Sequence, residues 1–151
     1  MPVKLPGLPT DQRTTAGELL QEVVNRISHR RGKTLQIMDE VPVTLHQTLL
    51  LTRLRQMSPC TASDLAVELN LSLPAVSQAI ARLVRLNLVT RVESATDRRK
   101  KQLATTRKTH ILLDRLVKAR SNEYSAGLSG LPADIGDRLI EVLQEVLRTL
   151  P

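Results

Sequence analysis

The sequence of 151 residues contains one cysteine and one tyrosine, and it has no phenylalanine or tryptophan. A disulfide-stapled scaffold needs paired cysteines, so this class is excluded. Proteins that bind RNA or single strands by stacking use several aromatic platforms, and one tyrosine is too few. The chain also lacks an apolar run of about 18 residues, which a membrane span needs. We therefore expect no membrane association, no cofactor and a cytoplasmic location.

Positive charge is abundant and concentrated in one stretch. Lys and Arg number 22 against 15 Asp and Glu, which gives a net charge of +7. Residues 82–120 hold 12 of the basic residues and only three acids. Hydrophobic residues make up 41% of the chain and recur at regular spacing, which excludes intrinsic disorder. A folded domain with one strongly basic region predicts an anionic partner, and double-stranded DNA is the leading candidate.

The order of elements predicts a mainly α-helical chain with a small β-hairpin. Pro2, Pro6 and Pro9 indicate an extended arm over residues 1–13, followed by one domain over 14–151. Within that domain we expect a DNA-binding lobe at about 44–106, with dimerisation helices at about 14–31 and 107–150. Further elements follow from capping residues and apolar spacing: helices beginning after Thr44, Thr61, Ser72, Thr106 and Pro132, and strands at 88–92 and 102–104.

Residues 61–87 have the pattern of a helix-turn-helix. A short helix ends at Asn70, a residue that tolerates a left-handed turn, and the next helix begins at Ser72. One face of this second helix is apolar and the other is small and polar, as a helix that lies against base edges requires. Gln78 can pair with adenine, and Arg82 and Arg85 lie at phosphate reach. The alternative is an ordinary surface helix in a bundle.

A basic hairpin follows that helix and has the pattern of a wing. Its tip carries Arg98, Arg99, Lys100 and Lys101, which suit the negative potential of a minor groove. We interpret Asp97 as a supporting residue that orients a neighbouring arginine through an ion pair. The alternative is a flexible charged loop.

The stretch from Asp64 to Arg91, followed by Asp97-Arg98-Arg99, resembles the MarR family of winged helix-turn-helix transcription regulators of bacteria and archaea. The spacing agrees without a gap from Leu65 to Thr106. Asn70 and Asn87 stand where the family usually has glycine, and Thr109 replaces a later glycine. The predicted DNA contacts are Ser72, Pro74, Ala75, Ser77, Gln78, Arg82, Arg85, Arg98, Arg99, Lys100 and Lys101.

The resemblance implies a homodimer that binds a palindromic operator, represses a promoter and is released by a small-molecule effector. Apolar stripes near both ends of the chain suit a shared interface, although the two stripes can also close on each other within one chain. The predicted dimerisation residues are Leu19, Val23, Leu139, Val142, Leu143, Val146 and Leu150. Candidate effector-pocket residues are His46, His29 and Arg30.

Two other functional classes compete with this hypothesis. One is a structural winged-helix protein that binds nucleic acid without regulating a gene. The other is a regulator that senses oxidants through Cys60, which lies before the Thr61 cap, where a helix N-terminus can lower a thiol pKa. The sequence shows no nucleophile–base pair, phosphate loop or paired carboxylates, so we expect no enzyme. The three histidines lack the spacing of metal ligands, and we expect no metal site.

Overall fold

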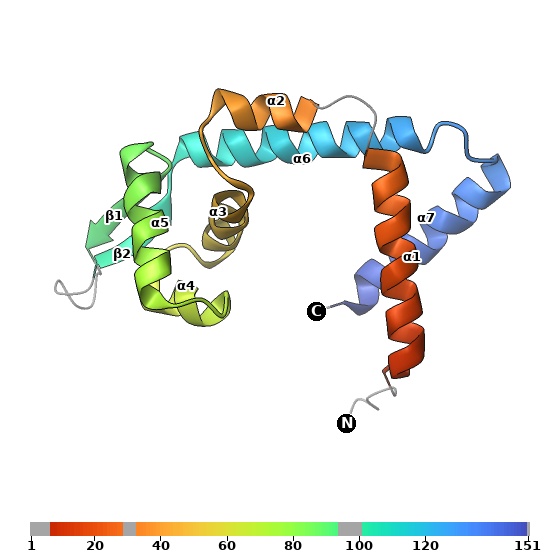
Figure 1. Ribbon diagram of the computed structural model, residues 1–151, viewed down its shortest axis with the longest axis horizontal. Coiled ribbons are helices and arrows are strands. Elements are labelled where there is room, and N and C mark those ends of the chain that lie inside the picture. Colours follow the sequence, from red (N-terminus) through yellow and green to blue (C-terminus); the bar gives the residue numbers. More distant parts are fainter. Residues whose placement is uncertain (1–6, 29–32, 94–100, 151) are drawn as a thin grey trace. The chain divides into compact units, whose positions relative to one another are not determined.

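The computed structural model describes residues 7–28, 33–93 and 101–150, and this part of the chain forms helices and one hairpin (Figure 1). The predicted fold class, mainly α with a small β-hairpin, is confirmed. The elements are α1 (Thr10–Ser28), α2 (Lys33–Glu40), α3 (Leu45–Met57), α4 (Ala62–Glu68), α5 (Leu73–Arg85), β1 (Val89–Glu93), β2 (Lys101–Thr105), α6 (Arg107–Gly127) and α7 (Ala133–Thr149).

The chain divides into two compact units. One, here called the winged unit, is Lys33–Ala119, and the other, the terminal unit, is Met1–Gly32 together with Arg120–Pro151. The lobe that the sequence predicts over 44–106 lies within the winged unit. The observed unit is wider because α2 and the first half of α6 contribute to its core: Ile37 on α2 and Leu112, Leu113 and Leu116 on α6 are buried.

Aliphatic side chains form the core of the winged unit. Leu51, Leu54, Leu65, Leu83 and Leu88 have no exposed surface. They come from α3, α4, α5 and the segment before β1, so one cluster joins the helix-turn-helix to the hairpin. No aromatic side chain takes part, as the composition requires. Aliphatic packing therefore holds the buried face of α5 against this core.

Side-chain caps fix where the helices of the winged unit begin. Thr44 and Gln47 form a reciprocal capping box at α3, as predicted, with N–O distances of 3.2 and 3.0 Å. Thr61 and Asp64 do the same at α4. The Ser72 hydroxyl accepts from the Ala75 amide at 3.4 Å, and proline lies in the first turn of α5. These caps position both helices of the helix-turn-helix.

Two asparagines adopt the left-handed conformation that the sequence predicts. Asn70 has φ of 51° and Asn87 has φ of 57°. Asn70 closes the turn between α4 and α5, and Asn87 follows the end of α5. Asparagine therefore supplies the positive φ at both turns that glycine adopts freely.

We expect Asn70→Ala to lower the free energy of unfolding by about 1 kcal/mol, because alanine lacks the local polar side chain that makes this conformation accessible. Asn70→Gly is the matched control and should lower it by much less, since glycine adopts positive φ freely. Urea denaturation of the three proteins measures the difference. Equal losses in both variants would show that the asparagine side chain, not the backbone angle, stabilises the turn.

Thr109 occupies a position where the resembling family has glycine, and the structure accommodates it. Its side chain is fully buried, and its hydroxyl donates to the Leu88 carbonyl oxygen. Thr106 caps the start of α6 by accepting from the Thr109 amide at 3.4 Å, and it also donates to the Asn87 carbonyl at 2.8 Å. The start of α6 is thereby attached to the segment that leaves α5.

The structure differs from the sequence predictions at three places. Residues 10–13, predicted as part of an extended arm, form the first turn of α1, because the Arg13 amide donates to the Pro9 carbonyl at 2.9 Å. Helix α2 was not predicted, since eight residues are too short to show helical periodicity. Apolar spacing after the Thr44 cap predicts that Leu45 and Leu49 share the buried stripe with Leu50, Leu51 and Leu54, but both are 57% exposed and Gln47 is buried instead.

The terminal unit contains α1, the last turns of α6 and α7. No described side chain of α1 or α7 is fully buried. Helices α1 and α6 approach closely at one point, because a Cβ added at Gly127 would lie only 2.6 Å from the Ile27 Cβ. A side chain at position 127 would thus force these helix ends apart. None of the helices in the described ranges is long and apolar enough to cross a membrane.

Candidate nucleic-acid interface

Helix α5 has one buried face and one polar face, as the sequence predicts. Val76, Ile80 and Leu83 are buried, whereas Ser77 and Gln78 are exposed. The predicted contacts Ser72, Pro74, Ala75, Arg82 and Arg85 are exposed as well. Figure 1 shows this helix beside the β1–β2 hairpin. The exposed face is free to meet a groove of duplex DNA.

A polar hollow of about 360 Å³ lies on one side of α5. It is lined by Thr44, His46, Gln47, Ala75, Gln78, Ala79, Arg82 and Arg85. The start of α3 thus contributes residues next to the two predicted phosphate contacts. The Arg82 guanidinium also donates to the Pro42 carbonyl oxygen at 3.2 Å, which orients it along this side of the helix. The hollow carries positive charge and hydrogen-bond donors suited to an anion.

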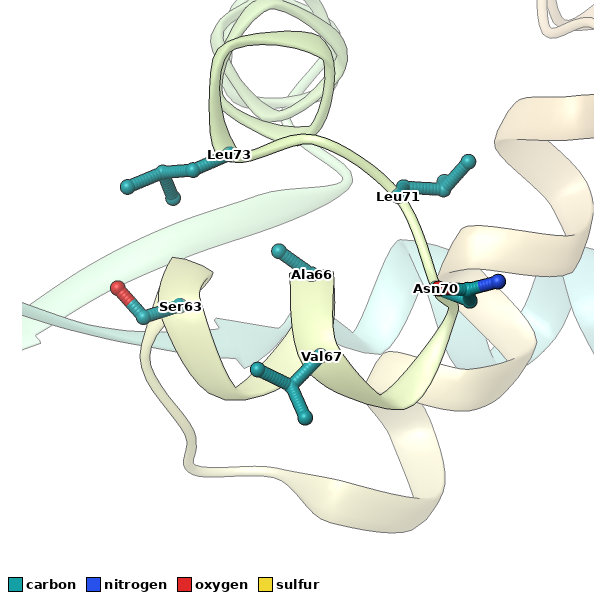
Figure 2. A pocket seen from close by; sticks show the side chains of 6 residues that line it. All are labelled: Ser63, Ala66, Val67, Asn70, Leu71 and Leu73. Atoms are coloured by element: carbon teal, nitrogen blue, oxygen red, sulfur yellow. The ribbon is translucent and has the colours of Figure 1, made fainter.

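A second hollow, of about 450 Å³, lies where α4 turns into α5 (Figure 2). It is lined by Ser63, Ala66, Val67, Asn70, Leu71 and Leu73, and these side chains include no cation. Leu73 is the first residue of α5 and is 45% exposed. Leu73 is absent from the DNA contacts that the sequence predicts. The sequence does contain a signal for its exposure, because Leu73 directly follows the N-cap serine and lies outside the buried stripe of α5.

The stem of the wing is an antiparallel hairpin that pairs Val89 with Thr105 and Glu93 with Lys101. Arg91 and Lys101 on this stem are exposed. The predicted tip residues Asp97, Arg98, Arg99 and Lys100 lie outside the described residues. The roles assigned to them therefore stay predictions.

Not all of the basic residues between 82 and 120 face the helix-turn-helix. Arg115 on α6 forms an ion pair with Glu40 on α2 at 2.7 Å. Lys108 donates to the Leu86 carbonyl at 3.0 Å, where a cation suits the end of α5. Asp114 pairs with Arg55 of α3 at 2.7 Å. Part of the positive charge therefore stabilises helix packing and termini within the winged unit.

Cys60 is buried and differs from the predicted reactive thiol. Its backbone pairs with Leu103, with N–O distances of 3.2 and 2.7 Å. Burial raises the pKa of the Cys60 thiol above its ordinary value, and the Asp64 carboxylate raises it further. The expected lowering by the helix N-terminus is wrong, because desolvation and a neighbouring negative charge both disfavour the thiolate.

Of the three predicted effector-pocket residues, one lies within the described residues. His46 lines the polar hollow and is exposed. His29 and Arg30 lie outside the described residues, so their effector role stays a prediction. Within the described ranges, no group of three or more His, Cys, Asp or Glu side chains is placed to hold a metal ion.

The capped helix pair, the polar exposed face of α5 and the adjoining hairpin define a winged helix-turn-helix protein. Residues 41–100 match the model of the MarR family, and this segment contains both helices of the motif and β1. The helix-turn-helix segment of this chain is therefore similar to the MarR family, and the fold is that of a winged-helix protein. None of the curated proteins matches this chain.

Solved structures share this fold at low sequence identity. The transcriptional regulator Tm0710 of Thermotoga maritima aligns with a TM-score of 0.73 at 20% identity, over 88% of this chain and 92% of that one. RV1404 of Mycobacterium tuberculosis gives 0.72 at 20% identity, over 97% and 98%. MepR of S. aureus, solved as a complex with DNA, gives 0.64 at 23% identity, over 92% and 96%.

Proposed function

We propose that this chain represses transcription as a homodimer that binds a palindromic duplex operator in the cytoplasm of a bacterium or archaeon. The observation that carries the proposal is the exposed face of α5. It presents Ser77 and Gln78, which lie between Val76 and Ala79 in sequence. Arg82 and Arg85 follow further along the helix. The S. aureus relative of the same fold has been solved on DNA, which supports the same partner here.

In this proposal α5 enters a major groove and the wing lies on the adjacent minor groove. The N-terminal half of the helix approaches the bases, because recognition helices of this class read base edges there. Gln78 pairs with adenine through its amide, and Arg85 neutralises a phosphate. Binding then blocks access to the promoter. The proposal assigns the chain no catalytic step.

A second copy supplies the other half of the operator complex. Helices α1 and α7 leave large apolar side chains exposed: Leu19, Leu20, Val23, Ile140, Val142, Leu143, Val146, Leu147 and Leu150. Exposed apolar surface of this extent is typical of an interface. A palindromic operator requires the two α5 helices of the dimer to lie about one turn of DNA apart, about 34 Å.

Release by a small molecule is the third part of the proposal. His46, Arg82 and Arg85 line one hollow, so an anionic ligand held there would occupy the face that meets DNA. A ligand with higher affinity for the free protein than for the operator complex shifts the equilibrium toward free protein. His46 is the described member of the predicted effector group.

Selection of bound fragments from random duplexes tests the DNA-binding proposal. We expect the selected fragments to share a palindrome whose two half-sites lie one helical turn apart. The protein should protect about 20 base pairs of such a site. Fragments without a common sequence would instead support a structural protein that coats DNA. If the protein retains no duplex at all, both the repressor and the structural DNA-binding function are contradicted.

On the selected operator, Gln78→Ala should reduce discrimination between bases by about 1–3 kcal/mol and leave non-specific affinity nearly unchanged. Arg85→Ala is the matched comparison on the same helix. It should weaken all duplexes alike and reduce the slope of log K against log salt by about 1. Fluorescence anisotropy at several salt concentrations measures both effects. Identical behaviour of the two variants would remove Gln78 from base recognition.

A further inference from the structure

The two sides of helix α5 differ in chemistry. The side that faces α3 borders the polar hollow with Gln78, Arg82 and Arg85. The side that faces α4 borders the apolar hollow with Leu73, and the described residues that line it include no basic side chain. Such a surface does not attract phosphate. In a major groove, this side of α5 is suited to contact an apolar group of the bases.

Leu73 is the side chain placed to make that contact. It is the first residue of α5, directly after the Ser72 cap, and Ser77 lies one turn further on the same side of the helix. Its side chain is 45% exposed, and Figure 2 shows it projecting away from the α4–α5 turn. The N-terminal residues of a recognition helix contact base edges, and Leu73 holds such a position on α5.

The apolar group that B-DNA presents in the major groove is the C5-methyl of thymine. We infer that Leu73 reads a thymine methyl in each operator half-site, and that it is a specificity-determining residue beside Gln78. This inference rests on the proposed function, since it requires α5 to lie in a major groove. It adds a requirement for thymine that the polar residues of the helix do not impose.

The test replaces thymine by deoxyuridine, one position at a time in both half-sites of the selected operator. This exchange removes one methyl group and leaves base pairing intact. We expect one symmetry-related pair of positions at which deoxyuridine weakens binding by wild-type protein about fourfold per methyl group. The same exchange should leave the affinity of Leu73→Ala unchanged.

Leu71→Ala is the matched control variant. Leu71 lines the same hollow with 44% exposure, but it lies in the turn and its side chain points away from Leu73 in Figure 2. It should keep the wild-type ratio of affinities for thymine and deoxyuridine at the sensitive position. Circular dichroism melting of both variants shows whether each remains folded.

Three results would overturn the inference: no position sensitive to deoxyuridine, sensitivity that persists in Leu73→Ala, or sensitivity lost equally in Leu71→Ala. Each of these outcomes leaves operator binding itself in place. If no duplex is selected at all, the proposed function fails instead. The two failures are therefore distinguishable.

Discussion

Leu54→Ala should destabilise the protein by about 2–5 kcal/mol, the loss expected when a fully buried leucine is truncated. Leu54 on α3 has no exposed surface and belongs to the cluster that joins α3, α4, α5 and β2. Removal of its side chain leaves a cavity that rigid neighbours fill only partly.

Leu49→Ala is the matched control, with the same truncation on the same helix at a residue that is 57% exposed. It should change the free energy of unfolding by less than about 1 kcal/mol, as exposed substitutions usually do. Urea denaturation at one fixed protein concentration compares the two variants. Similar losses at both positions would contradict the assignment of Leu54, rather than Leu49, to the core.

Leu143→Glu should convert the proposed dimer into monomers and weaken operator binding by at least about 2 kcal/mol. The reason is that a buried carboxylate without a partner is strongly unfavourable in an apolar interface, and symmetry introduces two of them. Leu143 is 46% exposed on α7 within the apolar stripe of that helix. Light scattering measures the mass, and anisotropy measures affinity for full and half operators.

Gln144→Glu introduces the same residue one position further along α7, rotated by about 100° around the helix. We expect it to remain dimeric and to bind the full operator like the wild type. Leu143→Glu should still bind a half-site weakly, since the winged unit does not contain α7. A Leu143→Glu protein that remains dimeric would contradict the proposed interface.

Local signals in the sequence predicted much of the winged unit. Thr44 with Gln47 and Thr61 with Asp64 cap their helices as expected, because a capping box depends only on residues three apart. The left-handed turns followed from the chemistry of asparagine in the same way. The buried stripe of α5 followed from its spacing, which places Val76, Ile80 and Leu83 on one face.

Features that depend on distant partners were not predictable. The run Leu49-Leu50-Leu51 fits more than one helical face, and only packing against α4 and β2 decides that Leu49 is exposed. Helix α2 is held by burial of Ile37 and by the ion pair of Glu40 with Arg115, 75 residues away in sequence. Cys60 was judged by its adjacent helix, whereas its burial comes from contact with the hairpin.

The hydrogen bonds between Cys60 and Leu103 have a consequence for operator architecture. They attach the residue before the Thr61 cap to β2, so the first helix of the DNA-reading motif and the stem of the wing share a backbone connection. In the proposed operator complex, this connection fixes the distance between the base pairs that contact α5 and the groove that contacts the wing. We expect one base pair inserted within a half-site to weaken operator binding. This loss should not depend on how many base pairs separate the two half-sites.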